Sequence, residues 1–136
     1  RSQLKRLLIT STRLLKRSLP EPAITNAHMN VVREYNLLVE KHFREFHKVK
    51  DYANLLFKSP KTLSNIFPKY SHKSPIMVIN DRILLESKRL LLYSDKSNEE
   101  IARELGYNDP SHFAKFFKNH LHLSPTAFRK EKLGAQ

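Results

Sequence analysis

The histidines are the first residues in this chain whose type could carry specific chemistry. The sequence contains seven His, and imidazole is a common ligand of zinc. His120 and His122 stand close together, but side chains two positions apart at a helix end diverge, and no Cys or carboxylate completes a ligand set. We therefore predict no bound metal, and the sequence indicates no other cofactor.

Patterns that support catalysis are also missing from the sequence. There is no Ser-His-Asp order, no paired acidic motif and no glycine-rich phosphate loop, and the chain contains only two Gly. We expect no enzyme activity. The chain has no Cys, which excludes disulfides and thiolate nucleophiles and fits a reducing cytoplasm.

The balance of charges favours a polyanionic partner. The 136 residues include 25 Lys and Arg against 13 Asp and Glu, which gives a formal net charge of +12. Nucleic acid and an anionic membrane surface both fit such a field. A membrane span needs roughly 18 apolar residues, whereas the longest aliphatic runs have three, so we expect a soluble protein. The length suits one compact domain, or two very small ones that share a helix.

An internal repeat indicates which elements position a binding site. Four matches share an offset of 50 positions: Ser59-Pro60 with Asp109-Pro110, Leu63 with Phe113, Phe67 with Phe117, and Ser74-Pro75 with Ser124-Pro125. Farther upstream, Ala53 and Leu56 match Ala102 and Leu105 at an offset of 49. The second copy therefore holds one more residue between its two halves, which predicts a turn there.

Apolar residues recur at helical spacing on both sides of this turn, so each copy is predicted to be two helices. These residues are Val49, Tyr52, Ala53, Leu56, Leu63, Ile66 and Phe67 in the first copy, and Ile101, Ala102, Leu105, Phe113, Phe116 and Phe117 in the second. Ser97 with Glu100 predicts a capping box, and Ser59-Pro60 and Asp109-Pro110 each place an N-cap before a helix-starting Pro. Gly106 is expected to adopt a left-handed conformation after the first helix. Two short helices joined by a tight turn form a helix-turn-helix unit.

One helix from Pro75 to Tyr93 is predicted between the two copies. We expect its apolar residues to be buried, namely Ile76, Ile79, Ile83, Leu84, Leu90 and Leu91, and Arg82, Glu86, Lys88 and Arg89 to face solvent. Such a helix is about 28 Å long, and equivalent major grooves of B-DNA repeat about every 34 Å. Two helix-turn-helix units could therefore be held one DNA turn apart.

Two further helices are predicted upstream of the repeat. An amphipathic helix carries apolar residues that are expected to pack over the first unit: Val31, Val32, Tyr35, Leu38, Val39, Phe43 and Phe46. Before it, Pro20-Glu21-Pro22 is expected to interrupt helical geometry and to form a linker. Residues 1–19 are predicted to be a separate helix with six Lys or Arg and no acidic residue. The predicted fold is all-α: two helix-turn-helix subdomains joined by a central linker helix, plus a separate N-terminal helix.

The segment EEIARELGYNDPSHFAKFFKNHLHLSPTAFR, at Glu99–Arg129, resembles the second helix-turn-helix of the AraC/XylS family of bacterial regulators. The shared pattern is Ile-Ala, a Gly-aromatic pair, a polar triplet, two Phe four residues apart, Ser-Pro and an aromatic-Arg pair. DYANLLFKSPKTLSNIFPKYSHKSP resembles the first unit of the family, and DRILLESKRLL its connecting helix. The resemblance covers roughly Val31 to Lys130. QLKRLLITSTRLL is similar to the last helix of the regulatory domain that precedes these units in many members, a helix that often mediates dimerisation.

The resemblance implies that the second helix of each unit reads bases in a major groove of DNA. The implied base-reading residues are Lys61, Ser64 and Asn65 in the first unit, and Pro110, Ser111, His112 and Lys115 in the second. Lys can donate to guanine, Asn can pair with adenine, and Ser or His can donate to either purine. The implied phosphate contacts are Lys58, Lys69, Lys73, Lys118 and Arg129. A solvated polar face is the alternative interpretation of both helices.

This sequence departs from the family pattern at three positions. Family members usually have Gly after each second helix, where this chain has His72 and His122. A left-handed conformation at a residue other than Gly costs about 1 kcal/mol, although His tolerates it better than most residues. Pro68 lies late in the first recognition helix and is expected to kink or shorten it, because Pro removes a backbone donor and clashes with the carbonyl of Ser64.

Phe113, Phe116 and Phe117 could stack on unpaired bases, but their spacing is more typical of a helix-pair core, and we expect them in the core.

The chain is predicted to divide into four parts. Residues 1–27 are the N-terminal helix and linker, as the tail of a preceding regulatory domain, and residues 28–73 are the first helix-turn-helix subdomain. Residues 74–94 are the connecting helix, and residues 95–133 are the second helix-turn-helix subdomain.

The predicted function is that of a sequence-specific DNA-binding transcription regulator of the bacterial cytoplasm and nucleoid. Its expected partner is double-stranded DNA, with RNA polymerase and a second copy, bound through residues 1–19 and a preceding domain, as further candidates; no membrane partner is expected. The alternatives are a basic amphipathic membrane-surface module and a protein-interaction module.

Overall fold

The computed structural model describes residues 20–134, and this part of the chain is entirely helical. Its helices are α2 (Pro20–His42), α3 (Val49–Leu55), α4 (Pro60–Tyr70), α5 (Pro75–Tyr93), α6 (Asn98–Glu104), α7 (Pro110–Leu121) and α8 (Pro125–Gly134). The all-α prediction is confirmed, and the connecting helix has the predicted bounds. The separate N-terminal helix predicted for residues 1–19 lies outside the described residues.

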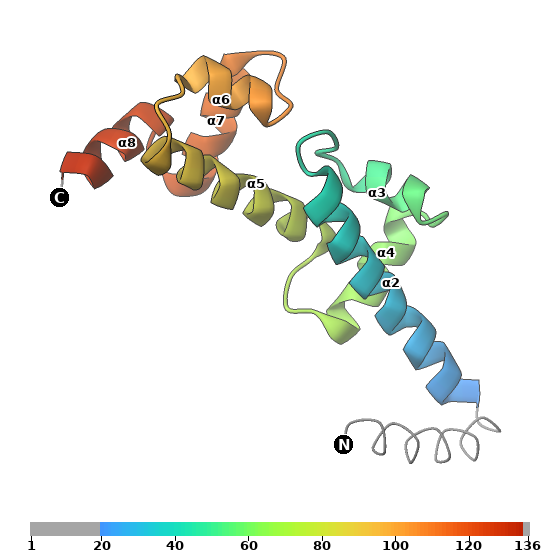
Figure 1. Cartoon of the computed structure of the whole chain (residues 1–136). Helices are drawn as coiled ribbons and strands as arrows, with labels where there is room; N and C mark the ends of the chain where they lie inside the picture. The colour runs from blue at the N-terminus through green and yellow to red at the C-terminus, as the bar shows by residue number, and fades with distance from the viewer. Residues whose placement is uncertain (1–19, 135–136) are drawn as a thin grey trace, which may run out of the picture.

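Figure 1 shows α5 extending from one group of helices to another. In the first group, α2 contacts α3, α4 and α5, so the amphipathic upstream helix packs over the first helix-turn-helix unit as predicted. In the second group, α6 and α7 form the second unit, and α8 packs against α5 and α7. The fold is therefore two small helical units that share one helix.

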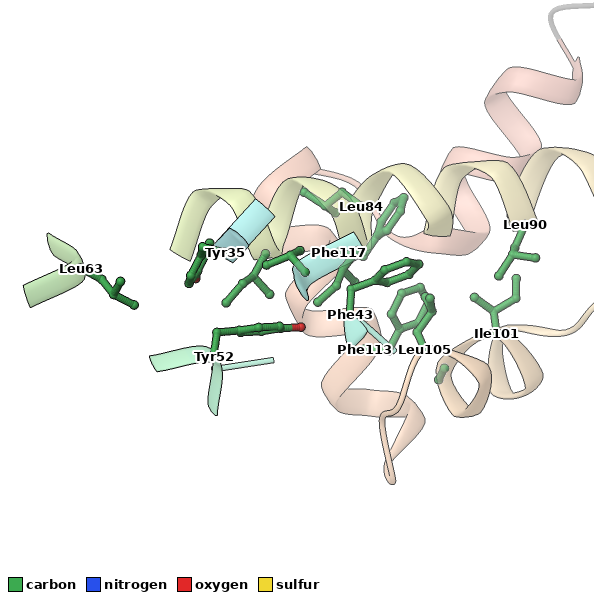
Figure 2. Packing of buried hydrophobic residues seen from close by; sticks show 14 of the residues in the cluster. Tyr35, Phe43, Tyr52, Leu63, Leu84, Leu90, Ile101, Leu105, Phe113 and Phe117 are labelled. Atoms are coloured by element: carbon green, nitrogen blue, oxygen red, sulfur yellow. The ribbon is translucent and has the colours of Figure 1, made fainter. Parts of the chain in front are cut away.

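Aromatic side chains fill the core of each unit (Figure 2). Around the first unit, the rings of Tyr35 and Phe67 have centroids 4.9 Å apart, and the Tyr35 hydroxyl donates to the carbonyl of Pro75 at 2.8 Å. In the second unit, Phe113 and Phe117 are fully buried, with tilted rings whose centroids are 5.9 Å apart. The third predicted core ring, Phe116, is partly buried and packs against this cluster. The prediction that these rings belong to the core is confirmed.

Side-chain caps define the starts of the helices. Ser59 accepts a hydrogen bond from the Thr62 amide at 3.1 Å at the start of α4. Ser97 and Glu100 form the predicted capping box at the start of α6, with reciprocal bonds of 3.1 and 2.8 Å. These local bonds satisfy amides that have no partner in the first helical turn, which explains why short sequence signals located the boundaries correctly.

Three residues of the described segment have a left-handed backbone: Phe57 (φ 56°), Gly106 (φ 91°) and His122 (φ 65°). The prediction for Gly106 is thus confirmed. Of the two His that stand where family members usually have Gly, His122 is left-handed and His72 is not, because the residue after α4, Ser71, is extended (φ −149°) and its hydroxyl accepts from the Lys73 amide. The first unit instead has its left-handed residue in the turn between α3 and α4, at Phe57.

Pro residues interrupt the helices less than the sequence suggested. Pro20-Glu21-Pro22 was expected to be a linker, but these residues form the first turn of α2, where a helix needs no amide donors. An interruption of helical geometry before Pro20 lies outside the described residues. The prediction for Pro68 was a kinked or short helix. α4 stays helical past Pro68 to Tyr70 and, at 11 residues, is only one residue shorter than α7.

Several side chains of α5 differ from the predicted burial: Ile76 and Glu86 by the most, and Arg82 and Lys88, which were expected in solvent, are only partly exposed. Ile76 was expected in the core but is 42 % exposed, in the first turn of the helix. Glu86 was expected in solvent but is only 2 % exposed, because it lies among guanidinium groups. Arg44 and Arg82 approach its two oxygens at 3.1 and 3.5 Å, and Arg89 donates to both oxygens. A buried carboxylate is stable only when it is paired in this way.

Glu86 predicts an acid-dependent loss of stability. Its pKa is lowered by the Arg89 hydrogen bonds and by the charges of Arg89, Arg44 and Arg82, against the effect of burial. The pKa of Glu86 is therefore lower in the folded protein than in the unfolded chain, where it is about 4.3. Such a group stabilises the folded protein fully above the unfolded pKa, and this stabilisation is lost as the pH falls through the folded pKa. The difference in unfolding free energy between the wild type and Glu86→Gln should therefore shrink from about pH 6 to pH 3 in urea titrations. A difference that stays constant over this range would contradict the assignment.

Candidate nucleic-acid interface

α4 has one buried face and one exposed polar face. Leu63, Ile66 and Phe67 are buried against α2 and α3. Lys61, Ser64 and Asn65 are all exposed, so the three residues predicted to read bases lie on the open face of the helix. The Thr62 hydroxyl is bonded to the Ser59 cap at 2.9 Å, which places Thr62 in the capping structure rather than among free donors.

α7 repeats this division in the second unit. Its core residues, Phe113 and Phe117, are buried, while Ser111, His112 and Lys115 are exposed and Pro110 is half-buried. Among the described residues, no ion pair involves Lys61 or Lys115. Both ammonium groups are thus available to an acceptor outside the chain.

Asp109 organises the start of α7. It accepts from the Ser111 amide at 3.0 Å and from the Ser111 hydroxyl at 2.9 Å. These hydrogen bonds lower the pKa of Asp109, so the carboxylate is charged at neutral pH. Because its hydrogen already points at Asp109, the Ser111 hydroxyl presents lone pairs outward and can accept from an amino group of adenine or cytosine. His112 lies 3.9 Å from the same carboxylate through Nε2.

The residues predicted to contact phosphate differ in whether their side chains are already paired within the chain. Lys58, Lys69 and Lys118 are exposed. Lys73 is paired with Asp81 at 2.9 Å, so a phosphate would compete with this carboxylate for its ammonium group. Both side chains of that pair are about half exposed, at 51 % and 46 %, and a surface pair of this kind contributes little to stability.

Arg129 has a structural role that the sequence did not indicate. Its Nε donates to the carbonyl of Leu91 at 2.8 Å, and its Nη2 donates to the carbonyl of Lys96 at 2.8 Å. The first bond ties α8 to the last turn of α5, where carbonyls have no partner within the helix, and the second ties it to the loop between α5 and α6. The predicted phosphate contact of Arg129 stays a prediction beside this role.

The sequence reasoning missed the residues that hold the two units together. These lie in the loop between α2 and α3 and on the buried side of α5. For Glu86 a signal existed, because it stands three residues after Ile83 and four before Leu90, on the apolar stripe of α5. For the loop there was no such signal, since irregular backbone has no period.

The described residues form neither a metal site nor a membrane-spanning helix. Between Pro20 and Gly134 no three His, Asp or Glu side chains come together where they could hold a metal ion. Within the same range, every helix is too short or too polar to cross a membrane.

Two helix-turn-helix units joined by a helix, each with an exposed polar second helix, define a DNA-binding domain by their arrangement. Residues 52–131 match the family described as "Helix-turn-helix domain". The chain belongs to this helix-turn-helix family, and within it to the AraC/XylS regulators. Members of the AraC/XylS family are DNA-binding transcription regulators and not enzymes.

Curated relatives with these units are bacterial regulators. The chain is 29 % identical over 93 residues to the regulatory protein PocR of Salmonella typhimurium, a match that covers 68 % of the chain and 31 % of PocR. It is 31 % identical over 119 residues to the transcriptional activator RhaS of Salmonella schwarzengrund, with coverage of 86 % and 42 %. The chain therefore spans less than half the length of these relatives.

Solved structures share the fold. The C-terminal domain of AraT, a response regulator from Geobacillus stearothermophilus, superposes with a TM-score of 0.68 at 26 % identity, over 74 % of this chain and 84 % of that domain. The DNA-binding domain of AdpA, solved in complex with a target DNA, has a TM-score of 0.67 at 25 % identity, over 76 % of this chain and 94 % of that domain.

Proposed function

We propose that this chain regulates transcription by placing the N-terminal halves of α4 and α7 in successive major grooves on one face of DNA. The observation that carries the proposal is the duplicated pair of exposed polar helices at the two ends of α5 (Figure 1). α5 has 19 residues and is about 28 Å long, close to the repeat of about 34 Å between equivalent grooves. The net charge of +12 supplies the attraction to the phosphate backbone.

The exposed residues divide into base contacts and phosphate contacts in this proposal. Lys61 and Lys115 donate to guanine, Asn65 pairs with adenine, and Ser64, Ser111 and His112 complete the reading surfaces with Pro110 in van der Waals contact. Lys58, Lys69, Lys73, Lys118 and Arg129 hold phosphates, which gives affinity without sequence information.

The remaining partners and the division of the chain are also proposals. A cytoplasmic, nucleoid-associated regulator fits the bacterial relatives. Because one of these relatives is a transcriptional activator, the proposal includes contact with RNA polymerase. Dimerisation through residues 1–19 and a preceding domain is proposed from the resemblance of that segment. The proposed units are 1–27, 28–73, 74–94 and 95–133.

Selection from a random duplex library in moderate salt tests the function. The chain should enrich a motif with two blocks about one helical turn apart. Recovery of no sequence preference over random competitor DNA would refute base reading, whatever the overall affinity.

Lys115→Ala and His112→Ala test the assignment of α7. Each should weaken binding to the selected site by about 1 to 3 kcal/mol and relax the preference at one position of the second block. Lys118→Ala is the matched control, on the same helix and equally cationic, and should weaken all sequences alike while lowering the salt dependence. The readout is fluorescence anisotropy on the selected site and on variants of each block. Uniform weakening by Lys115→Ala would reassign that residue to phosphate.

A further inference from the structure

The loop between α2 and α3 contacts the second helix-turn-helix unit directly. His47 Nε2 lies 2.7 Å from the carbonyl oxygen of Leu105. A carbonyl only accepts, so Nε2 carries the hydrogen and donates it. The His47 ring also packs against the Tyr107 ring at a tilt of 36°, with centroids 4.6 Å apart. A loop of the first unit is thereby attached to the turn between α6 and α7, the turn that sets the direction of a recognition helix.

Gly106 shows how closely these two segments approach. A Cβ at this position would lie 2.1 Å from the carbonyl oxygen of Arg44 and 3.1 Å from His47 Nε2. The corresponding residue of the first unit is Phe57, which has a similar left-handed backbone but is 94 % exposed. A bare backbone at Gly106 is therefore favoured for two reasons, the left-handed conformation of the turn and the close contact between the two units.

The same loop is anchored to the connecting helix. Arg44 donates to the buried Glu86 of α5 at 3.1 Å. Arg44 and Arg82 lie over the Phe43 ring at 4.5 and 4.1 Å from its centroid, and Phe43 is 1 % exposed. The loop thus bridges α5 and the second unit, and restrains rotation of that unit about α5.

We propose that this inter-unit contact, formed by Arg44, His47, Leu105, Gly106 and Tyr107, fixes the separation and relative rotation of α4 and α7. It thereby makes His47 a positioning residue that determines which spacing between two half-sites the chain binds. The inference rests on the proposed two-groove function. Each added base pair displaces one half-site by about 3.4 Å and rotates it by roughly 35°, and a restrained pair of units cannot follow this movement.

Binding to duplexes with altered spacing tests the proposal. The probes are the site that the wild type selects from a random library, the same site with one or two base pairs inserted or removed between its blocks, and a site with one block scrambled. For the wild type, one inserted base pair should lower affinity by about tenfold or more, because simultaneous engagement is lost. His47→Ala should reduce this penalty by about threefold or more and leave affinity for the one-block site unchanged.

His47→Gln and Glu45→Ala are the control variants. Gln offers an amide donor near the position of Nε2 and should restore the spacing penalty. Glu45 lies in the same loop, is paired with His42 and makes none of the contacts to the second unit, so its removal should leave the penalty as in the wild type. Far-UV circular dichroism and thermal unfolding confirm that each variant is folded.

A distance measurement tests the restraint without DNA. Lys50 and Glu99 occupy corresponding exposed positions of α3 and α6, and the chain has no Cys, so Lys50→Cys with Glu99→Cys allows specific spin labelling. The distance distribution should be narrow in the wild-type background and broader with His47→Ala. An unchanged distribution, or an unchanged spacing penalty, would overturn the inter-unit role while leaving DNA binding intact. Failure of the wild type to select any sequence would contradict the proposed function and the spacing role together.

Discussion

Replacing Glu86 with Ala is expected to lower the unfolding free energy by about 3 kcal/mol. The carboxylate is 3 % exposed and is the shared partner of Arg44, Arg82 and Arg89. Arg44 and Arg89 are about half exposed and can turn to water when it is removed. Arg82 is 22 % exposed, and its Nη1 is buried with no hydrogen-bond partner among the described residues, so this end of the guanidinium would lose its nearest compensating charge. Equilibrium urea unfolding gives the difference.

Glu40→Ala is the matched control for Glu86→Ala. Glu40 also pairs with Arg82, at 2.8 and 3.0 Å, so the two variants remove a carboxylate from the same guanidinium. The Glu40 side chain is 62 % exposed, however, and a loss below about 1 kcal/mol is expected. Equal losses for the two variants would show that burial of Glu86 does not set the size of the effect.

Gly106→Ala is expected to destabilise the chain by about 3 kcal/mol. A left-handed Ala costs about 1 kcal/mol, and the new Cβ would meet the Arg44 carbonyl at 2.1 Å, which forces the backbone of the α2–α3 loop to move. Because that loop connects the two units, the variant should also lose cooperativity between them. Urea unfolding followed by circular dichroism measures both effects, as a lower midpoint and a shallower slope.

Phe57→Gly provides the opposite case at the corresponding turn. Phe57 has a left-handed backbone and is 94 % exposed, so its side chain contributes little packing. Glycine should stabilise the first unit by about 1 kcal/mol through release of backbone strain. An unchanged stability of Gly106→Ala would contradict the close contact at Gly106. An unchanged stability of Phe57→Gly would contradict the backbone strain at Phe57.

The amino-acid sequence by itself determined the helices and their order. Caps at Ser59, Ser97 and Asp109, and apolar residues at helical spacing, act over three to four residues. The connecting helix consequently has its predicted bounds, Pro75 to Tyr93. The internal repeat located the α3–α4 and α6–α7 turns because it too consists of such local signals. The exposed faces of α4 and α7 also followed from this periodicity, while their base contacts remain a prediction.

Only the tertiary structure decided how the units are joined. The His47–Leu105 contact spans 58 residues, and the Arg44–Glu86 contact spans 42. Contacts between residues so far apart in the sequence depend on how the helices pack against each other. The spacing of apolar residues within one helix does not predict that packing. For the same reason a charged Glu86 is buried and Arg129 is bonded to the end of α5. Local interactions form the reading helices, and long-range packing sets their positions relative to each other.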